Sequence, residues 1–282
     1  MNVSIETPAK INRFLYILDR RPDGYHSILT MFEKVALFDT IEIDAEKADR
    51  GSKNSIAIDC PDWLPSGPEN LVYKACEAFA DAAEISIDVS AVIKKNIPVG
   101  GGLGGGSSDA AAALRAMNMV FAHVLEPEEL HGIACRLGAD VPFFLTDWTC
   151  ALGTGIGDVL EPCNAGHNWY VLVFPGFQVS TRWAYENFKL TRKSDVTIFD
   201  RRRLLSGNLW QNDLEEPVYA RYPELLSIKS SLMKAGACAS LMSGSGSTVF
   251  GVFDSRERAA AGAASVTADT GMNCLVTRTL EG

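Results

Sequence analysis

A run of six glycines in seven positions, residues 100–106 with Leu103 inside it, constrains this chain more than any other feature. It lies between an alternating, strand-like segment, 85–93, and an alanine-rich segment, 109–124, whose composition is typical of a helix. Glycine has no Cβ, so the backbone there takes positive φ and brings successive N–H groups against a ligand. The start of the helix adds unpaired N–H groups and the positive end of its dipole. The run therefore predicts a phosphate-binding loop rather than a flexible linker.

Three better-known phosphate loops do not fit this run. Gly100, Gly102 and Gly105 form a G-x-G-x-x-G register, but no β-α-β unit opens the chain as a Rossmann dinucleotide site requires. A Walker A loop requires lysine at the position of Ser107. In protein kinases the A-V-I-K segment follows the glycine loop, whereas here residues 91–94 precede it. The loop therefore indicates another class of phosphate-binding protein.

Composition and charge exclude several functional classes. The chain has 282 residues, 47% of them hydrophobic, which is enough for a large buried core. Its 26 basic and 35 acidic residues give a net charge of −9, so we expect neither a nucleic acid nor a membrane as partner. No apolar stretch approaches the ~20 residues of a membrane span, and the first residues lack the features of a signal peptide.

The cysteines and histidines indicate neither disulfides nor a metal centre. The seven cysteines are scattered without a C-x-x-C pair, which is typical of reduced thiols in the cytoplasm. His123, His131 and His167 fall in no metal-binding spacing, and the serine-hydrolase signature G-x-S-x-G is absent. We therefore expect a cytoplasmic protein whose side chains form no metal site of their own.

Periodicity predicts strands mixed with helices but no regular β-α-β alternation, which is typical of an α+β fold. The turn-forming residues 21–24 and 39–40 separate the first strands, and Ser107 or Ser108 is the expected N-cap after the glycine run. We expect a boundary near residues 150–157, giving one domain over 1–153 and a second, α/β domain over 154–282. The expected strands are 11–18, 28–38, 41–43, 85–93, 148–152, 169–174, 239–242, 248–253 and 273–279. The expected helices are 70–83, 109–124, 126–137, 182–188, 224–235 and 255–268.

Three segments together resemble the GHMP small-molecule kinases. The marks of that family are an early P-x-K-[IV]-N, a central P-x-G-x-G-L-[GS]-S-S and a late S-G-[SA]-G motif. They correspond here, in the same order, to residues 8–12, 98–109 and 242–247. The resemblance implies a two-lobed α+β kinase that binds ATP at the glycine run, with Mg²⁺ held by the phosphates.

Two further blocks indicate a substrate. The blocks R-R-P-D-G-Y-H, ending at His26, and L-G-A-D-V-P-F-F, starting at Leu137, are typical of the family member that acts on a cytidine diphosphate conjugate of methylerythritol. They imply transfer of the γ-phosphoryl group of ATP to the 2-hydroxyl of the methylerythritol part, a step of non-mevalonate isoprenoid precursor biosynthesis. The basic segment 182–203 follows no family pattern.

Two residues carry the implied catalysis. By resemblance, Asp140 is the base that accepts the proton of the substrate hydroxyl, and Lys10 keeps it ionised and neutralises charge on the transferring group. From the residues alone, Asp140 is equally well a buried cap of the next turn, and Lys10 a surface lysine. Asn12 shares the strand face of Lys10, since side chains alternate with a period of two, and is expected to bind the substrate.

The remaining site residues follow from the resemblance. Tyr25 is expected to stack on the cytosine ring, His26 to hydrogen-bond its edge, and Tyr185 to stack on the other side. The serine hydroxyls and loop amides are expected at the phosphates, and Lys95 near the adenosine end. The full set expected to bind ATP is Asn70, Lys95, Pro98, Gly100, Gly101, Gly102, Gly104, Gly105, Gly106, Ser107 and Ser108.

Two alternatives stay open. The chain is either a GHMP kinase for another small alcohol or, from a different functional class, a catalytically inactive relative that binds nucleotide as a sensor. Retention of both Lys10 and Asp140 argues against the sensor. In either case we expect a small-molecule ligand and a monomer or weak homodimer.

Overall fold

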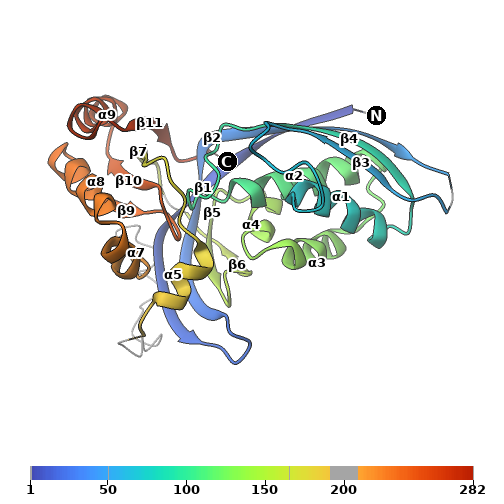
Figure 1. Ribbon diagram of the computed structural model, residues 1–282, viewed down its shortest axis with the longest axis horizontal. Coiled ribbons are helices and arrows are strands. Elements are labelled where there is room, and N and C mark those ends of the chain that lie inside the picture. Colours follow the sequence, from blue (N-terminus) through green and yellow to red (C-terminus); the bar gives the residue numbers. More distant parts are fainter. Residues whose placement is uncertain (1, 50, 165, 191–208, 282) are drawn as a thin grey trace. The chain divides into compact units, whose positions relative to one another are not determined.

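The computed structural model describes residues 2–49, 51–164, 166–190 and 209–281 (Figure 1). The chain folds into two compact units, each assembled from segments far apart in the sequence. Unit 1 comprises Met1–Ala9, Leu37–Ile97 and Gly104–Asp147, and unit 2 comprises Lys10–Ala36, Pro98–Leu103 and Trp148–Gly282. Two long strands, β1 (Asn2–Arg20) and β2 (His26–Lys47), contribute residues to both.

Unit 1 is a β-sheet covered by helices. Its strands are the first part of β1, the second part of β2, β3 (Ser55–Asp59) and β4 (Ile87–Lys94). Strand β4 is antiparallel to β2 and parallel to β3. Buried and exposed residues alternate along β4, as expected for a sheet with one covered face. Apolar side chains of β2 and β4, such as Ile43 and Val89, pack in one core with Phe79 and Leu114 from the helices. The helices are α1 (Leu71–Ala82), α2 (Gly105–Val120), α3 (Pro127–Leu137) and α4 (Val141–Leu145) (Figure 1).

Unit 2 contains two groups of strands. In the first, β2 pairs antiparallel with β5 (Cys150–Thr154), β5 pairs with β6 (Val159–Pro162), and β1 pairs in parallel with β8 (Gln211–Asn212). The second is an antiparallel sheet in the order β11 (Asn273–Arg278), β7 (Trp169–Phe174), β10 (Val249–Phe253) and β9 (Ala239–Met242). The helices of this unit are α5 (Thr181–Asn187), α7 (Glu215–Arg221), α8 (Pro223–Lys234) and α9 (Arg256–Thr270).

A buried charged cluster joins the elements of unit 2. Glu33 of β2 is fully buried; its Oε1 accepts hydrogen bonds from the Tyr170 hydroxyl at 2.8 Å and the Thr279 hydroxyl at 2.6 Å. Arg13 of β1 lies with its Nη1 3.3 Å from Glu33 Oε2, and its guanidinium stacks over the Trp210 ring. Burial raises the pKa of Glu33, and the Arg13 charge opposes that rise. Sequence periodicity gave no signal for this cluster.

The α+β class is confirmed, and β7 and β9 have the expected bounds. Two expectations were wrong. Asp39 and Thr40 form no turn but lie inside β2, where Thr40 pairs with Lys94. The helix after the glycine run begins at Gly105, with Gly104 as its N-cap, so Ser107 and Ser108 lie within its first turn. Glycine is also favoured at an N-cap, so Gly104 takes this position before either serine is reached.

Several elements lacked a sequence signal. The short elements β3, β6, β8, α4 and α7 were not expected from the sequence. The predicted division at residues 153 and 154 stays a prediction, since the contact units interleave along the chain. Of the basic segment, residues 191–203 lie outside the described ranges. None of the helices in the described ranges has both the length and the apolar character needed to cross a membrane.

Candidate functional site

The glycine run leads directly into α2. Gly100, Gly102 and Gly104 have φ of 69°, 75° and 71°, a left-handed conformation that side chains other than glycine rarely adopt. Gly104 is the N-cap of α2, so the backbone N–H groups of the first helical residues have no acceptor within the helix. These are Gly105, Gly106 and Ser107. The arrangement has the donors and the dipole orientation that an anion requires.

The first half of the run belongs to unit 2, where it contacts the late glycine motif. The Gly101 carbonyl accepts a hydrogen bond from the Thr248 N–H at 3.2 Å, and the Gly102 carbonyl accepts one from Ser243 Oγ at 2.9 Å. The backbones are so close that a Cβ on Gly102 would lie 2.0 Å from the Ser243 carbonyl oxygen. A Cβ on Gly101 would likewise lie 3.4 Å from the oxygen of Pro98, at the start of the run. Two motifs far apart in the sequence therefore form one backbone cluster.

Lys10 and Asn12 lie in the same part of unit 2. Lys10 is buried, its N–H donates to the Leu103 carbonyl at 2.9 Å, and its Nζ donates to Asn12 Oδ1 at 2.7 Å. Asn12 Nδ2 in turn donates to Thr30 Oγ1 at 2.8 Å. The predicted common face of Lys10 and Asn12 is confirmed by their direct hydrogen bond. Lys10 is therefore a buried cation with a fixed orientation, not a surface lysine.

A further residue, Asn212, supports this cluster. Its Nδ2 donates to the carbonyls of Met242 and Gly244, at 2.8 and 2.7 Å. A Cβ on Gly244 would lie 3.4 Å from Asn12 Oδ1, which places the late motif beside the early one. No sequence signal marked Asn212, because it lies in a two-residue strand outside the three motifs.

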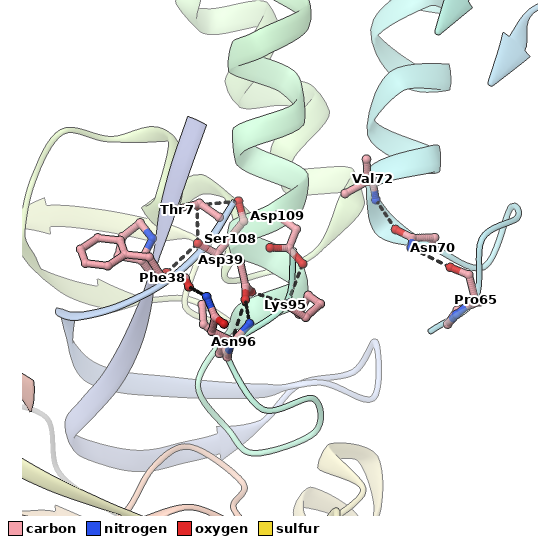
Figure 2. A network of polar contacts seen from close by, with 12 residues as sticks. Thr7, Phe38, Asp39, Pro65, Asn70, Val72, Lys95, Asn96, Ser108 and Asp109 are labelled. Carbon is pink, nitrogen blue, oxygen red and sulfur yellow. Dashed lines mark hydrogen bonds and ion pairs between the residues drawn. The ribbon is translucent and has the colours of Figure 1, made fainter. Parts of the chain in front are cut away.

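The second half of the run belongs to unit 1, where Ser108 faces inward. Its side chain is buried, and Oγ lies 2.5 Å from Thr7 Oγ1 (Figure 2). Oγ also donates to the Pro8 carbonyl at 2.6 Å, and the Ser108 N–H donates to the Gly104 carbonyl at 2.9 Å. These bonds attach α2 to β1. Ser108 thus uses its polar groups inside the unit, while Ser107, one position earlier, is half-buried.

Asn70 has a local structural role. Its Oδ1 accepts from the Val72 N–H at 2.8 Å, which caps α1, and its Nδ2 donates to the Pro65 carbonyl at 2.7 Å (Figure 2). Both ends of the amide are therefore engaged within unit 1. A contact of Asn70 with nucleotide stays a prediction.

Lys95 lies between two buried carboxylates. Its Nζ donates to Asp109 Oδ2 at 2.7 Å and forms an ion pair with Asp39, and its side chain is only 1% exposed (Figure 2). Burial raises the pKa of Asp109 to about 7, with Lys95 lowering it and Asp39 raising it further. Neither carboxylate was among the predicted site residues. Asp109 had been read as a helix-start residue, and Asp39 as part of a turn.

Asp140 lies at the start of α4, also in unit 1. Its side chain makes no capping hydrogen bond to α4, so the interpretation as a cap of that turn is not supported. The Val141 N–H donates to the Gly138 carbonyl at 3.1 Å, which closes the turn around Asp140. A Cβ on Gly138 would lie 4.0 Å from Ser107 Oγ, so this turn lies close to the first turn of α2. Lys10 belongs to unit 2, and its pairing with Asp140 stays a prediction.

The residues expected to bind cytosine lie at the hairpin between β1 and β2. Tyr25 is exposed, with 62% of its surface accessible. The His26 ring stacks on the Tyr185 ring, with centroids 5.4 Å apart and an angle of 27° between the planes. Partial burial and the nearby Arg20 charge lower the pKa of His26, and the Asp19 charge opposes this shift. The structure thus brings His26 and Tyr185 together within unit 2 and leaves Tyr25 open to solvent.

Among the residues that the structure describes, no group of three or more His, Cys, Asp or Glu side chains has the geometry to hold a metal ion. A magnesium ion bound mainly through phosphate oxygens needs few protein ligands. Its binding to this chain stays a prediction.

Comparison with known families defines the class of protein. The model of the GHMP kinases N terminal domain matches residues 70–147, and that of the GHMP kinases C terminal domain matches residues 188–270. The first match contains the glycine run and Asp140. The chain belongs to the GHMP kinase family and is a small-molecule kinase.

Its full-length relatives in that family are 4-diphosphocytidyl-2-C-methyl-D-erythritol kinases. The protein of that name from Syntrophotalea carbinolica is 41% identical over 276 residues, 95% of each chain. The one from Geobacter sp. strain M21 is 41% identical over 280 residues, 97% of each chain.

Solved structures agree with this placement. A crystal structure of 4-(cytidine 5'-diphospho)-2C-methyl-D-erythritol kinase has a TM-score of 0.81 and 31% identity, covering 99% of this chain and all of its own. Homoserine kinase from Cytophaga hutchinsonii has the same fold, with a TM-score of 0.73 at 17% identity over 99% of this chain and 94% of its own. The GHMP kinase fold is thus shown by a solved relative whose structure matches 99% of this chain.

Proposed function

We propose that this kinase transfers the γ-phosphoryl group of ATP to the 2-hydroxyl of 4-diphosphocytidyl-2-C-methyl-D-erythritol, a step in non-mevalonate isoprenoid precursor biosynthesis. The observation that carries the proposal is the full-length similarity, at 41% identity over 95% of each chain, to kinases named for this substrate. Each part of the reaction is assigned below to residues that the sequence singled out.

The ATP phosphates bind at the glycine run and the start of α2. The left-handed backbone at Gly100, Gly102 and Gly104 and the open N–H groups of Gly105, Gly106 and Ser107 support this placement. Lys95 lies beside the same helix start, where its ammonium is held between Asp39 and Asp109. Magnesium, when bound by the phosphates, would neutralise charge on them.

Asp140 accepts the proton of the attacking hydroxyl. Its position next to the turn at Gly138, close to Ser107 at the helix start, supports this role. Lys10, held by Asn12, supplies a fixed positive charge for the transferring group, and Asn12 binds the substrate. Phosphoryl transfer demands little covalent chemistry from a protein, so positioning and charge supply most of the acceleration.

Tyr25 and His26 bind the cytosine. The exposed Tyr25 ring offers a stacking surface, and His26, held against Tyr185, offers ring nitrogens for the base edge. In this role Tyr185 orients His26 in addition to stacking near the base. Cytidine recognition distinguishes this kinase from family members that act on small alcohols without a base.

A coupled assay of ADP release tests the proposal. We expect turnover with the methylerythritol conjugate, none with mevalonate or homoserine, and competitive inhibition by cytidine nucleotides. Turnover of another alcohol without cytidine competition supports the alternative GHMP kinase. Nucleotide binding without turnover of any alcohol supports the sensor.

We also propose that the protein acts in the cytoplasm as a monomer or weak homodimer, with a small molecule rather than a nucleic acid as its ligand. Its seven free cysteines and net charge of −9 support this view. Sedimentation at micromolar concentration measures the oligomeric state.

A further inference from the structure

Asp39 is a buried carboxylate in unit 1 that belongs to none of the family motifs. Its two oxygens face different donors. Oδ1 accepts from the N–H groups of Asn96 and Ile97, at 2.6 and 2.9 Å, and Oδ2 forms an ion pair with Lys95 Nζ (Figure 2). One side chain thus holds three consecutive residues that follow β4.

The backbone next to Asp39 reinforces this hold. Asn96 Nδ2 donates to the carbonyl of Phe38 at 2.9 Å (Figure 2). Residues 95–97 form the last part of unit 1 before the chain enters the glycine run at Pro98. Asp39 and its neighbour therefore fix the segment from which the phosphate loop departs.

The same segment touches the start of α2. A Cβ built on Gly105, the first residue of α2, would lie 2.9 Å from Ile97 Cγ2 and 3.1 Å from Lys95 Nζ. Gly105 is helical and not left-handed, so its lack of a side chain is needed for this close packing. A shift of Lys95 or Ile97 is thereby passed to the helix start by direct contact.

The two carboxylates around Lys95 also differ in how many hydrogen-bond donors they receive. Asp39 receives two backbone N–H groups as well as the ammonium, whereas Asp109 Oδ1 is buried with no hydrogen-bond partner among the described residues. A carboxylate with more donors is the better stabilised anion. Asp39 is therefore the charge that holds Lys95, and Asp109 is the weaker partner.

We propose that Asp39 is a positioning residue for nucleotide binding. It holds the Lys95 ammonium and the backbone of 95–97 in one geometry, and through their contact with Gly105 it fixes the start of α2. This inference deepens the proposed nucleotide site and rests on ATP binding there. Asp39 itself is not proposed to contact the reacting atoms.

Asp39→Asn tests the proposal. An amide has one acceptor and one donor end, so its NH₂ must face either the two backbone N–H groups or the Lys95 ammonium. We expect the Kd of a non-hydrolysable ATP analogue, measured by calorimetry, to rise about 10-fold or more. In turnover, KM for ATP should rise while kcat and KM for the alcohol stay within about twofold, a split that general destabilisation does not produce.

Glu42→Gln is the matched control. Glu42 of β2 forms an ion pair with Lys94, the last residue of β4 and the neighbour of Lys95, and both side chains are partly exposed. This variant removes an ion pair of the same kind without touching residues 95–97, so the Kd for the ATP analogue should not change. Melting temperatures of both variants establish that each is folded.

A double-mutant cycle with Lys95→Met tests whether Asp39 affects nucleotide binding through Lys95. When Lys95 is already methionine, Asp39→Asn should increase the Kd clearly less than it does in the wild type. An equal increase in both backgrounds overturns the proposal that Asp39 acts by holding Lys95. An unchanged Kd in folded Asp39→Asn overturns it outright.

The test of Asp39 can be distinguished from the test of the proposed function. Nucleotide binding is measured without any alcohol, so loss of the methylerythritol activity assignment leaves this test intact. If Asp39→Asn does not fold, Asp39→Glu keeps the charge and displaces it by one methylene group. A folded Asp39→Glu with wild-type Kd likewise counts against the proposal, and a raised Kd supports it.

Discussion

Ser243 donates a hydrogen bond through Oγ to the carbonyl of Gly102 at 2.9 Å, which joins two glycine-rich motifs 141 residues apart. Gly102 has a φ of 75°, and no side chain fits between its Cα and the Ser243 backbone. The contact explains why the run needs glycine here for close approach as well as for conformation. It also gives the first half of the phosphate loop a rigid support within unit 2.

We predict that Gly102→Ala weakens ATP binding by more than about 10-fold, because a Cβ at 2.0 Å from the Ser243 oxygen forces the two backbones apart. The measurement is the Kd of an ATP analogue, with a thermal melt to confirm folding. Gly176→Ala is the control: Gly176 has a φ of +84° but nothing within 4 Å of its Cβ position. It should lose about 1 kcal/mol of stability from backbone strain and keep the wild-type Kd.

A second prediction concerns the proposed base. Asp140→Asn keeps the shape of the side chain but removes the proton acceptor, so kcat should fall by about 10²–10⁴-fold with little change in the Kd for ATP. Asp147→Asn, two residues beyond α4 and with a side chain 93% exposed, should retain wild-type turnover. Near-normal kcat in folded Asp140→Asn would mean that this residue only organises its turn.

A third prediction concerns pH. Burial raises the pKa of Asp109 to about 7 from an ordinary value of 3.8, so the folded state binds a proton more tightly than the unfolded state. The stability from this group is then present at pH 4 and lost as the pH rises toward 7 and above. Asp109→Asn removes this loss. Its free energy of unfolding should match that of the wild type near pH 4 and exceed it by roughly 1 kcal/mol or more at pH 8.

Urea titrations at several pH values measure this difference, and Asp147→Asn again serves as the exposed control. The opposite trend would show that the ion pair with Lys95 dominates: the variant would then become less stable than the wild type as the pH rises. In that case the pKa of Asp109 would lie below its ordinary value.

The sequence was sufficient for much of the fold because segments with a clear apolar pattern carry their own signal. The helix α1 and the strands β7 and β9 follow from apolar spacing alone. The inward orientation of Ser108 and the role of Asp39 had no such signal, because both depend on partners far along the chain, Pro8 and Lys95. A turn-forming pair such as Asp39–Thr40 continues a strand when backbone pairing and a buried ion pair stabilise it.

The family motifs grouped residues that local periodicity does not connect, but they did not specify which side chains face the site. They brought together Lys10, Asn12 and the late glycine motif, which no local pattern connects, and unit 2 contains all three side by side. They did not distinguish Ser107 from Ser108, although one is half-buried near Gly138 and the other is bound to β1. A motif specifies residue types, whereas the helix phase decides which side chain faces the site.

The last prediction concerns specificity at Tyr25. If the exposed Tyr25 ring stacks on cytosine, Tyr25→Ala should lose roughly 1–3 kcal/mol of binding for the cytidine conjugate, the range typical of base–aromatic stacking. A poor substrate without the base, methylerythritol phosphate, places nothing against that ring. Its kcat/KM should therefore be almost the same in the wild type and the variant. The two substrates and two proteins form a cycle in which only the cytidine-dependent value changes.

Trp63→Ala provides a matched control for this cycle. Trp63 is 63% exposed, close to the 62% of Tyr25, but it lies in the loop between β3 and α1 of unit 1. Loss of an exposed aromatic ring there should leave kcat/KM unchanged for both substrates. Equal losses for both substrates in Tyr25→Ala would show that the ring supports the hairpin instead of the base. Such a result would favour a GHMP kinase that acts on an alcohol without a nucleotide, because the cytidine would then have no aromatic surface at this hairpin to recognise it.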